Sequence, residues 1–417
     1  MSELYIQGGV PLEGSLTVQG AKNSVLPILA ACLLAHGNVE LSNCPILSDV
    51  SAAITILRRL GCKVSRRGHD VEVDASTADG NTIPEEQMHA MRSSIIFLGP
   101  LLARMGEAHV TCPGGCELGP RPIDLHLRAI RDLGCVVKED GNGIHCYGRP
   151  RGGEVRLSIP SVGATENAML CAVGGSGETT IINAAREPEV VQLQEFLNGL
   201  GANIRGAGGS VIMVEGGKKL HSGACRIIGD RIVAATLLAA AAAAGGEVSL
   251  SGVDWRHLST VLSVFRQAGC RVVSEENRIT LSRLSDSRLK SVLPVSTAPY
   301  PGFPTDAQAV VMAAMCTARG DTEFIENMFE SRYRHVPSLR QMGADIEMDG
   351  RLAVVHGVNR LHGAQVCAGD LRGGGALAVA AMGAEGDTVL SGLHHIDRGY
   401  ESLEEMLRQL GGRVSRR

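Results

Sequence analysis

The segment PGGCELGPRPIDLH, residues 113–126, places a cysteine where cysteines are seldom found. Three glycines rule out a stable helix around Cys116, and the neighbouring residues offer no apolar face for the thiol. Most cysteines are small, buried, apolar residues. A thiol beside the cation of Arg121 can have a lowered pKa, and such a thiol can act as a general acid or as a nucleophile. We therefore interpret Cys116 as a reactive residue; the competing interpretation is a loop with an incidental cysteine.

Basic residues stand where apolar helices are expected to begin. Lys22 opens one such helix, and Arg372 opens another within AGDLRGG. A helix N-terminus attracts anions and disfavours cations, so a cation there is best explained by an anion that it shares with the helix. Arg231 fits this interpretation and a purely structural one equally well. The polar clusters at the six expected helix starts are Lys22-Asn23-Ser24, Arg92-Ser93-Ser94, Ser161-Val162-Gly163 with Thr165, Asp230-Arg231, Thr305-Asp306 and Asp370-Leu371-Arg372.

The competing interpretation of these clusters is that they are helix N-caps. Serine, threonine and aspartate are preferred at that position because their side chains accept hydrogen bonds from the first free N–H groups. Lysine and arginine do not fit this role. The residues for which the capping interpretation is suitable are Ser161, Thr165, Thr305 and Asp370.

Two further arginines occupy equivalent places after strands, Arg332 in FESRYRHVP and Arg398 in HHIDRGYES. A guanidinium group binds a carboxylate or phosphate at two points. His394, His395 and Asp397 resemble a metal site, but adjacent histidines in a strand point to opposite faces, so we expect no metal there. No Walker loop, G-x-S-x-G or H-E-x-x-H motif is present. The anion is therefore not expected to be ATP held in a P-loop.

The chain repeats one unit six times. An apolar residue followed by glycine recurs after amphipathic helical stretches, at intervals of roughly 70 residues. Each glycine suits the C′ position of a helix, which requires a positive φ, and a strand pair follows most of them. A strand, a polar cluster and an apolar helix precede each one, so the unit is strand–helix–strand–helix–strand–strand. The glycines are Gly61, Gly134, Gly201, Gly269, Gly343 and Gly411.

A chain of 417 residues is too long for one ordinary core, and we expect two domains of three units each. Residues 21–229 are expected to form one α/β domain that carries the cysteine loop. Residues 1–20 and 230–417 are expected to form the other. If the three apolar helices of each domain point inward, their N-termini converge on one face. Two such domains would then enclose an anion-binding active site in the cleft between them.

Composition and charge argue against several classes of protein. The formal net charge of −4 gives no general attraction to nucleic acid or to acidic membranes, and 3% aromatic residues make a base-stacking platform unexpected. We expect neither kind of partner. The first residues show no signal-peptide pattern, and the most apolar stretch, from Ala234, is too short and too rich in alanine to span a bilayer. The spacing of the twelve cysteines suggests neither disulfides nor zinc, which favours a cytoplasmic location.

Together these motifs resemble those of the UDP-N-acetylglucosamine 1-carboxyvinyltransferases, enolpyruvyl transferases with the EPSP synthase-like fold. The resemblance runs from end to end and rests on QGAKNSVLP, PGGCELGPRPIDLH, PSVGATEN, NAAREPEVV, FPTDAQA, FESRYRHVP, AGDLRGG and HHIDRGYE. It implies a two-domain inverted α/β barrel, or alpha/beta prism, with three βαβαββ-type repeats in each domain. It also implies transfer of the enolpyruvyl group of phosphoenolpyruvate to the 3′-hydroxyl of UDP-N-acetylglucosamine with release of phosphate, the first committed step of peptidoglycan synthesis. No metal and no organic cofactor are implied.

The resemblance also assigns roles to residues that bind phosphoenolpyruvate. Lys22, Arg121 and Arg398 would hold its phosphate and carboxylate groups, with Asn23 and Arg372 in support. Phosphoenolpyruvate carries up to three negative charges in a small volume, which agrees with a cluster of cations at helix starts.

Acid and base roles follow from the same resemblance. Cys116 would donate a proton to the enol methylene, can add covalently to the substrate, and would be the attachment point of the antibiotic fosfomycin. Asp306 would accept the proton of the sugar hydroxyl or orient that hydroxyl. Met328 would contact the sugar, and Arg332 and Asp370 would shape the closed site. The residues implied to bind the uridine diphosphate portion are Arg92, Arg121, Pro122, Ile123, Asp124, Leu125, Ser161, Val162, Gly163 and Ala164.

The sequence departs from the family pattern at a few positions. Val233 stands where many members have a carboxylate, and Ile159 replaces a lysine that contacts the diphosphate in some relatives. Gly373–Gly375 interrupt the start of the last apolar helix. These departures concern details of uridine binding and hinge stiffness.

Two alternative functions remain open at this point. One is the sister enzyme that acts on shikimate 3-phosphate, which shares the fold but opens with a G-S-K-S-type motif and lacks the cysteine loop. The other is a catalytically idle paralogue that binds UDP-sugars. The joint presence of Lys22, Cys116, Asp306 and Arg398 argues against the second alternative.

Overall fold

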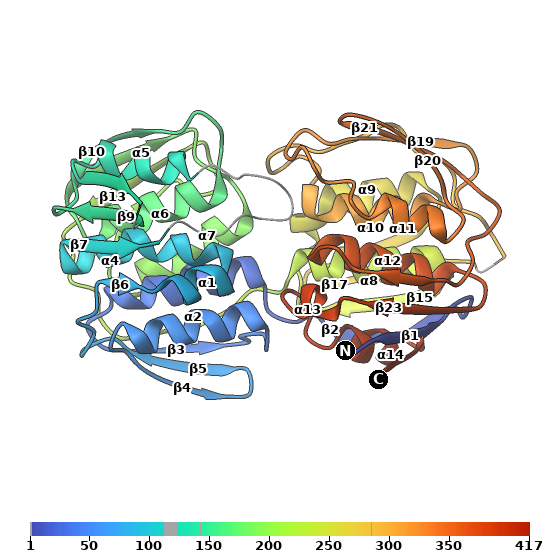
Figure 1. Cartoon of the computed structure of the whole chain (residues 1–417), viewed down its shortest axis with the longest axis horizontal. Helices are drawn as coiled ribbons and strands as arrows, with labels where there is room; N and C mark the ends of the chain where they lie inside the picture. The colour runs from blue at the N-terminus through green and yellow to red at the C-terminus, as the bar shows by residue number, and fades with distance from the viewer. Residues whose placement is uncertain (1, 112–122, 142, 285) are drawn as a thin grey trace. The chain divides into compact units, whose positions relative to one another are not determined.

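The computed structural model describes residues 2–111, 123–141, 143–284 and 286–417, apart from the side chains of residues 89, 90 and 92. Within these residues the chain forms two compact units (Figure 1). The N-terminal unit contains the described residues from Gly20 to Ile228. The C-terminal unit contains Gly229–Arg417 and the described residues before Gly20.

Each unit contains three four-stranded sheets, and all six sheets have the same topology. In each sheet the first strand is parallel to the second, and the remaining two pairings are antiparallel. An inner helix precedes the second strand, and an outer helix leads from it to the strand pair that completes the sheet. The predicted fold class, α/β with six βαβαββ-type repeats, is confirmed.

The sheets of the N-terminal unit share this strand order, and the first sheet takes its first strand from the end of the unit. The sheets are β14 (Gly223–Arg226)–β3 (Asn38–Ser42)–β5 (Asp70–Asp74)–β4 (Lys63–Arg67), β6 (Thr82–Ile83)–β7 (Glu107–Val110)–β9 (Gly143–Tyr147)–β8 (Val136–Asp140), and β10 (Arg151–Arg156)–β11 (Ser176–Ile182)–β13 (Val211–Gly216)–β12 (Asn203–Arg205).

The C-terminal unit depends on the first two strands of the chain, each of which joins a different sheet. The sheets are β2 (Leu12–Thr17)–β15 (Gly246–Ser251)–β17 (Arg278–Arg283)–β16 (Arg271–Glu275), β18 (Val295–Ser296)–β19 (Asp321–Ile325)–β21 (Leu352–His356)–β20 (Asp345–Asp349), and β22 (Gln365–Cys367)–β23 (Asp387–Ser391)–β1 (Leu4–Gln7)–β24 (Arg413–Arg416).

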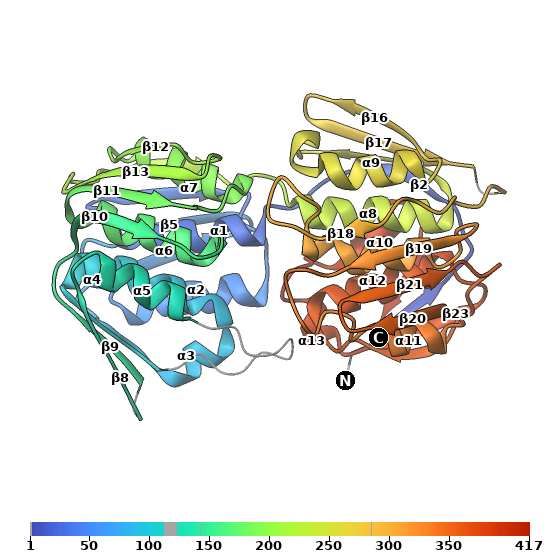
Figure 2. The same ribbon diagram turned by 90° about the horizontal axis from the view of Figure 1, so that it is seen from above.

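Inner helices form the centre of each unit, with the sheets outside them (Figure 2). In the N-terminal unit the inner helices are α1 (Lys22–Ala31), which continues as the 3₁₀ turn η1 (Cys32–Leu34), η2 (Arg92–Phe97) with α4 (Leu98–Met105), and α6 (Val162–Val173). The remaining helices of this unit are α2 (Ser48–Arg59), α3 (Glu85–Ala90), α5 (Asp124–Asp132) and α7 (Pro188–Gly199).

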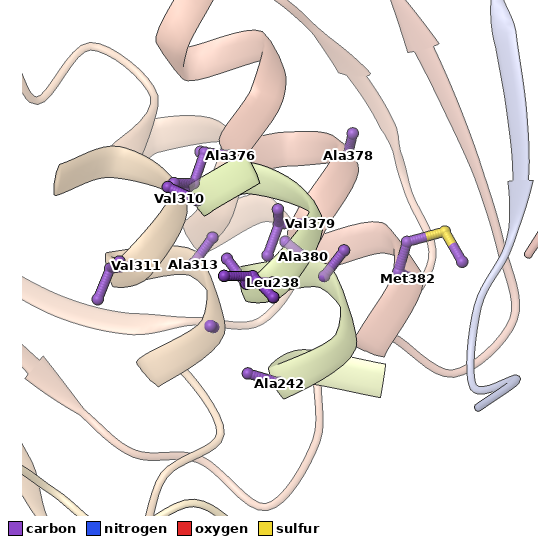
Figure 3. Packing of buried hydrophobic residues seen from close by; sticks show 14 of the residues in the cluster. Leu238, Ala242, Val310, Val311, Ala313, Ala376, Ala378, Val379, Ala380 and Met382 are labelled. Carbon is purple, nitrogen blue, oxygen red and sulfur yellow. The ribbon is translucent and has the colours of Figure 1, made fainter. Parts of the chain in front are cut away.

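In the C-terminal unit the inner helices are rich in alanine and pack directly against one another (Figure 3). Small side chains let helix axes approach closely. A Cβ atom built on Gly383, for example, would lie 3.1 Å from the Cβ atom of Ala243. The inner helices are α8 (Arg231–Ala244), α10 (Thr305–Met315) and α12 (Leu371–Gly383); the others are η3 (Trp255–Leu258), α9 (Ser259–Gln267), α11 (Val336–Gln341), α13 (Leu393–Ile396) and α14 (Leu403–Gln409).

The alanines of the stretch that starts at Ala234 lie within α8, and all of them except the half-buried Ala243 are buried in this core. None of the described helices is long and apolar enough to cross a membrane. The small side chains of α8 suit its close packing against α10 and α12.

The six repeat glycines end six outer helices in the same way. In the first repeat, the N–H of Gly61 donates to the carbonyl of Arg58, and the N–H of Cys62 donates to the carbonyl of Leu57. This pair of bonds is the Schellman motif, which requires the left-handed conformation that glycine adopts most easily. All six glycines have a φ between 80° and 101°: Gly61, Gly134, Gly201, Gly269, Gly343 and Gly411.

Candidate active site

All six inner helices begin at the polar clusters that the sequence singled out. Three of these starts carry a side-chain cap. Ser161 accepts a hydrogen bond from the N–H of Ala164, and Asp230 accepts two from the N–H groups of Ile232 and Val233. Asp370 caps α12 in the same manner as Asp230 caps α8. The capping interpretation therefore holds for Ser161 and Asp370.

The same interpretation was wrong for the two threonines. Thr165 lies inside α6, where its hydroxyl donates to the carbonyl of Ser161 and accepts from the N–H of Ala185. The hydroxyl of Thr305 donates to Glu326, 2.9 Å away, instead of accepting from its own helix. Both hydroxyls thus bond to other segments, because Thr165 accepts from the backbone after β11 and Thr305 donates to the carboxylate after β19.

The start of α10 places Asp306 between two arginines. A guanidinium nitrogen of Arg332 lies 2.5 Å from one carboxylate oxygen, and a guanidinium nitrogen of Arg372 lies 2.8 Å from the other. The side chains of Arg332 and Arg372 are only 2% and 7% exposed, whereas that of Asp306 is 27% exposed. Charge-assisted hydrogen bonds of this kind favour the ionised carboxylate. Asp306 therefore presents a fixed negative charge to solvent, with two buried cations behind it.

Arg372 is held in place by groups from three elements. Burial lowers its pKa, but the charge of Asp306, together with Tyr400 and Asp230, outweighs burial and leaves the pKa above its ordinary value. Tyr400 is 1% exposed, and its hydroxyl lies 3.0 Å from the hydroxyl of Thr236 in α8. Arg372 is therefore a permanently charged residue in a fixed orientation.

Two of the three glycines after Arg372 are required by close packing. A Cβ atom on Gly374 would lie 2.6 Å from a side-chain carbon of Ile396, and one on Gly375 would lie 2.5 Å from the Tyr400 hydroxyl. The glycines do not interrupt α12, which runs through them. Because these glycines have no side chains, the side chain of Tyr400 can lie beside α12, close to Arg372.

Glu326 is a site residue that the sequence reasoning missed. Its carboxylate, on a residue only 1% exposed, accepts hydrogen bonds from the hydroxyls of Thr297 and Thr305 and from the N–H groups of Met328 and Phe329. It thereby positions the implied sugar-contact residue Met328 and the residue before Asp306. Comparison of the repeats could have identified Glu326, because it directly follows a strand, as Asn43 and Asn183 do in other repeats.

Replacing Glu326 by alanine is expected to lower the free energy of unfolding by about 3 kcal/mol, because two hydroxyls and two backbone N–H groups lose their acceptor. The midpoint of urea-induced unfolding measures this loss. The exposed residue Glu330 gives a matched control, and Glu330→Ala is expected to change stability by less than about 0.5 kcal/mol. Equal stability of the two variants would contradict the role given to Glu326.

Arg398 lies just beyond α13, in a segment held by the C-terminal strand. The guanidinium group of Arg416 in β24 binds both carboxylate oxygens of Asp397, at 2.6 and 2.9 Å. The structure corrects one expectation here. His394 and His395 belong to helix α13 and not to a strand, and their ring centroids lie 4.0 Å apart. The reason given against a shared metal ion was therefore wrong, because it assumed strand geometry.

In the N-terminal unit, Lys22 begins α1 and pairs with Asp49 of α2. The ammonium nitrogen lies 2.6 Å from a carboxylate oxygen, and the side chains are 9% and 1% exposed. Asn23, the next residue, is exposed. Asp49 was not among the predicted site residues, because it lies in another helix without a motif of its own. The pair holds the Lys22 ammonium group at the start of α1.

The segments implied to bind uridine diphosphate are brought together by a histidine and an asparagine. Asn167 of α6 contacts the ring nitrogen Nδ1 of His126 in α5 at 3.0 Å and donates to the carbonyl of Ile95 in η2. A Cβ atom on Gly163 would lie 3.1 Å from the His126 ring. The structure thus joins residues 123–125 to residues 161–164, and neither His126 nor Asn167 was among the predicted site residues.

Several predicted site residues fall outside this description. Cys116, Arg121 and Pro122 lie outside the described residues, and for Arg92 only the backbone, at the start of η2, is described. Two departures from the family pattern lie in different surroundings. Ile159 precedes α6 and is 58% exposed, whereas Val233 lies in α8 and is fully buried in the core. Among the described residues, no group of three or more histidine, cysteine, aspartate or glutamate side chains could hold a metal ion.

Both units are expected to lose stability as the pH falls from about 6.5 to about 4. Burial lowers the pKa of His126 and of His335 to about 4, while histidines in an unfolded chain titrate near 6.5. In this window the unfolded chain binds protons that the folded chain does not, so the stabilisation is complete above pH 6.5 and is lost toward pH 4. Each histidine accounts for about 3 kcal/mol.

Urea-induced unfolding at pH 7 and pH 4.5 measures this dependence. His335→Asn is expected to reduce it, while replacement of the exposed His221 by asparagine is expected to leave it unchanged. An identical pH dependence in His335→Asn and in the unmodified chain would exclude His335 as its source.

The chain is similar to known proteins along nearly its whole length. The family model described as EPSP synthase (3-phosphoshikimate 1-carboxyvinyltransferase) matches residues 6–407. The UDP-N-acetylglucosamine 1-carboxyvinyltransferase 2 of Caldanaerobacter subterraneus subsp. tengcongensis is 47% identical over 417 residues, with both chains fully covered. The UDP-N-acetylglucosamine 1-carboxyvinyltransferase 1 of Symbiobacterium thermophilum is 46% identical, covering all of this chain and 95% of that protein.

Solved structures show the same architecture. The enolpyruvyl transferase NikO from Streptomyces tendae superposes with a TM-score of 0.88 at 24% identity, covering all of this chain and 98% of that one. An EPSP synthase from Acinetobacter baumannii superposes with a TM-score of 0.75 at 16% identity, with full coverage of both chains. At these identities the likeness concerns the fold alone.

Proposed function

Because the chain belongs to the UDP-N-acetylglucosamine 1-carboxyvinyltransferases, within the wider family that the EPSP synthase model describes, we propose that it transfers the enolpyruvyl group of phosphoenolpyruvate to the 3′-hydroxyl of UDP-N-acetylglucosamine. Phosphate is the second product, and the reaction is the first committed step of peptidoglycan synthesis. The observation that carries the proposal is the carboxylate of Asp306 between Arg332 and Arg372 at the start of α10.

Protonation of the enol methylene starts the chemistry. It creates an oxocarbenium-like centre at the second carbon of phosphoenolpyruvate, which the sugar hydroxyl attacks. Cys116 supplies this proton, and Asp306 orients the hydroxyl and accepts its proton as the new bond forms. Loss of phosphate from the second carbon, together with loss of one proton from the methyl group that the first step formed, then restores the double bond. The acid and base roles need no metal or organic cofactor.

Cations bind the substrate. Lys22, Arg121 and Arg398 hold the phosphate and carboxylate groups of phosphoenolpyruvate, with Asn23 and Arg372 in support. Arg92, residues 121–125 and residues 161–164 bind the uridine diphosphate portion. Lys22 belongs to the N-terminal unit and Asp306 to the C-terminal unit, so the proposal gives each unit a role in the reaction.

The cysteines support a reducing location. The ten described cysteines are free, and eight of them are buried. Burial raises the pKa of Cys62 to about 11 and that of Cys44 to about 12, so these thiols are poor nucleophiles at neutral pH. We place the enzyme in the cytoplasm, where free thiols persist.

Phosphate release tests the proposed reaction. The purified chain is supplied with phosphoenolpyruvate and either UDP-N-acetylglucosamine or shikimate 3-phosphate. Release with UDP-N-acetylglucosamine alone is the expected result. Release with shikimate 3-phosphate alone would assign the chain to the sister activity, and release with neither acceptor would indicate an idle paralogue.

Cys116→Ser tests the acid role. We expect turnover to fall by about 100-fold or more, since general acid catalysis contributes at least that factor. Mass spectrometry after incubation with fosfomycin is expected to show an adduct on the unmodified chain and none on Cys116→Ser. Cys367 is the exposed cysteine among those described, so Cys367→Ser is the control and should still be labelled. Labelling of Cys116→Ser would refute the assignment.

A further inference from the structure

A pair of histidines lies on one sheet of the N-terminal unit, on residues that the proposed reaction does not use. His109 of β7 and His145 of β9 are direct cross-strand partners. Their Nδ1 atoms are 2.7 Å apart, and their ring centroids are 5.0 Å apart. The side chains are 24% and 25% exposed, so small ions in solution can reach them.

Neighbouring residues hold both rings in this position. The strand neighbours Ala108 and Cys146 are fully buried, so the alternation of side chains along a strand turns both histidines to the opposite face of the sheet. The ring of Tyr147 meets that of His109 edge to face, with 5.6 Å between the centroids. The two imidazoles are therefore aligned before any ligand arrives.

Each histidine also faces a carboxylate with its other ring nitrogen. Nε2 of His109 lies 3.9 Å from Glu107, and Nε2 of His145 lies 3.5 Å from Asp140. A carboxylate favours the tautomer that carries its hydrogen on the facing nitrogen. If both rings adopt that tautomer, two lone pairs on Nδ1 point at each other, which is unfavourable unless a cation lies between them.

We propose that His109 and His145 bind one divalent transition-metal ion through their Nδ1 atoms, with water completing the coordination. Imidazole nitrogen suits Cu²⁺, Ni²⁺ and Zn²⁺. Metal-bound histidines usually donate their other ring N–H to a carboxylate, and Glu107 and Asp140 are the carboxylates nearest to these nitrogens, at 3.9 and 3.5 Å. The site is a two-histidine chelate, in keeping with the absence of larger ligand groups among the described residues.

Only a small movement of the rings is needed. Two nitrogens bound at about 2.0–2.1 Å to a tetrahedral ion lie about 3.3 Å apart. The Nδ1 atoms, now 2.7 Å apart, must therefore separate by about 0.6 Å. Small rotations of two partly exposed side chains provide this distance. The bound ion would link β7 to β9.

Nickel binding and thermal stability test the site. The full chain is freed of metal with a chelator and titrated with Ni²⁺ by calorimetry at pH 7.5. We expect one equivalent to bind, and binding to be at least about tenfold weaker in His109→Asn and in His145→Asn. Ni²⁺ should also raise the Tm of the unmodified chain more than that of either variant, because it binds the folded state. Glu107→Gln should weaken binding without changing the stoichiometry.

The other close histidine pair provides the control. His394→Asn/His395→Asn removes two histidines whose rings lie 4.0 Å apart on α13 and is expected to bind Ni²⁺ like the unmodified chain. Loss of binding in this variant would overturn the proposal, as would equal binding by His109→Asn and the unmodified chain. Nitrogen NMR that shows one proton shared between the two Nδ1 atoms, with no effect of Ni²⁺, would also overturn it.

Discussion

Replacing Asp306 by asparagine is expected to lower the kcat of phosphate release by about 1,000-fold, with a much smaller change in the KM for UDP-N-acetylglucosamine. Asparagine has nearly the same shape, but it cannot accept the hydroxyl proton. It also removes the negative charge that Arg332 and Arg372 contact at 2.5 and 2.8 Å. The proposed base and the anchor of both arginines are thus lost in one substitution.

The two arginines also limit how Asp306 can act. A carboxylate that accepts charge-assisted hydrogen bonds on both oxygens is stabilised in its ionised form, and this makes it a weak base before the reaction starts. We therefore expect Asp306 to orient the hydroxyl first and to take its proton only when the oxocarbenium-like carbon withdraws electrons from that oxygen. Asp306→Glu keeps the negative charge but moves the carboxylate by the length of one methylene group. This variant should retain more activity than Asp306→Asn.

Stability must be measured beside activity for these variants. Breaking a buried ion pair can cost about 3–5 kcal/mol, so the urea midpoint of each variant decides whether the protein assayed is folded. A folded Asp306→Asn variant whose kcat stays within about threefold of the unmodified value, about 0.7 kcal/mol in barrier height, would reject the role of Asp306.

The repeat glycines show why so much of the fold could be predicted from sequence. A Schellman motif needs a positive φ at one position, and glycine adopts that conformation most easily. The requirement is local, so it leaves a mark in the sequence at each of six helix ends. Gly61 and Gly411, at opposite ends of the chain, have φ values of 90° and 87°. The starts of the inner helices could also be recognised in the sequence, because lysine and arginine are unusual at a helix N-terminus.

The partners of the site residues could not be predicted in this way. Asp49 pairs with Lys22, and Tyr400 and Asp230 influence Arg372, yet each partner comes from a different element. A contact of this kind depends on tertiary packing and leaves no local pattern. Glu326 lies between these two cases. It has no motif of its own, but alignment of the six repeats would have placed it beside Asn43 and Asn183. Gly373–Gly375 were predicted to interrupt a helix because helix propensity is local, while the packing that requires two of them is not.

Replacing Lys22 by methionine is expected to lower kcat/KM for phosphoenolpyruvate by about 100- to 1,000-fold. Methionine keeps an unbranched side chain of similar length but has no ammonium group to bind an anion. The KM for UDP-N-acetylglucosamine should change far less, because the uridine diphosphate portion binds other residues. Steady-state kinetics with each substrate varied in turn measure both effects.

The ion pair with Asp49 complicates that variant and also supplies its control. Lys22→Met removes the ammonium group that lies 2.6 Å from a carboxylate on a side chain only 1% exposed, so it should also cost about 3–5 kcal/mol of stability. In the double variant Lys22→Met/Asp49→Asn the carboxylate charge is removed as well, and most of that stability should return. The affinity for phosphoenolpyruvate should not return, because Lys22 is the residue of this ion pair that binds the substrate, and it stays replaced. If the double variant recovers both stability and kcat/KM, Lys22 serves the fold alone and its place in the reaction is refuted.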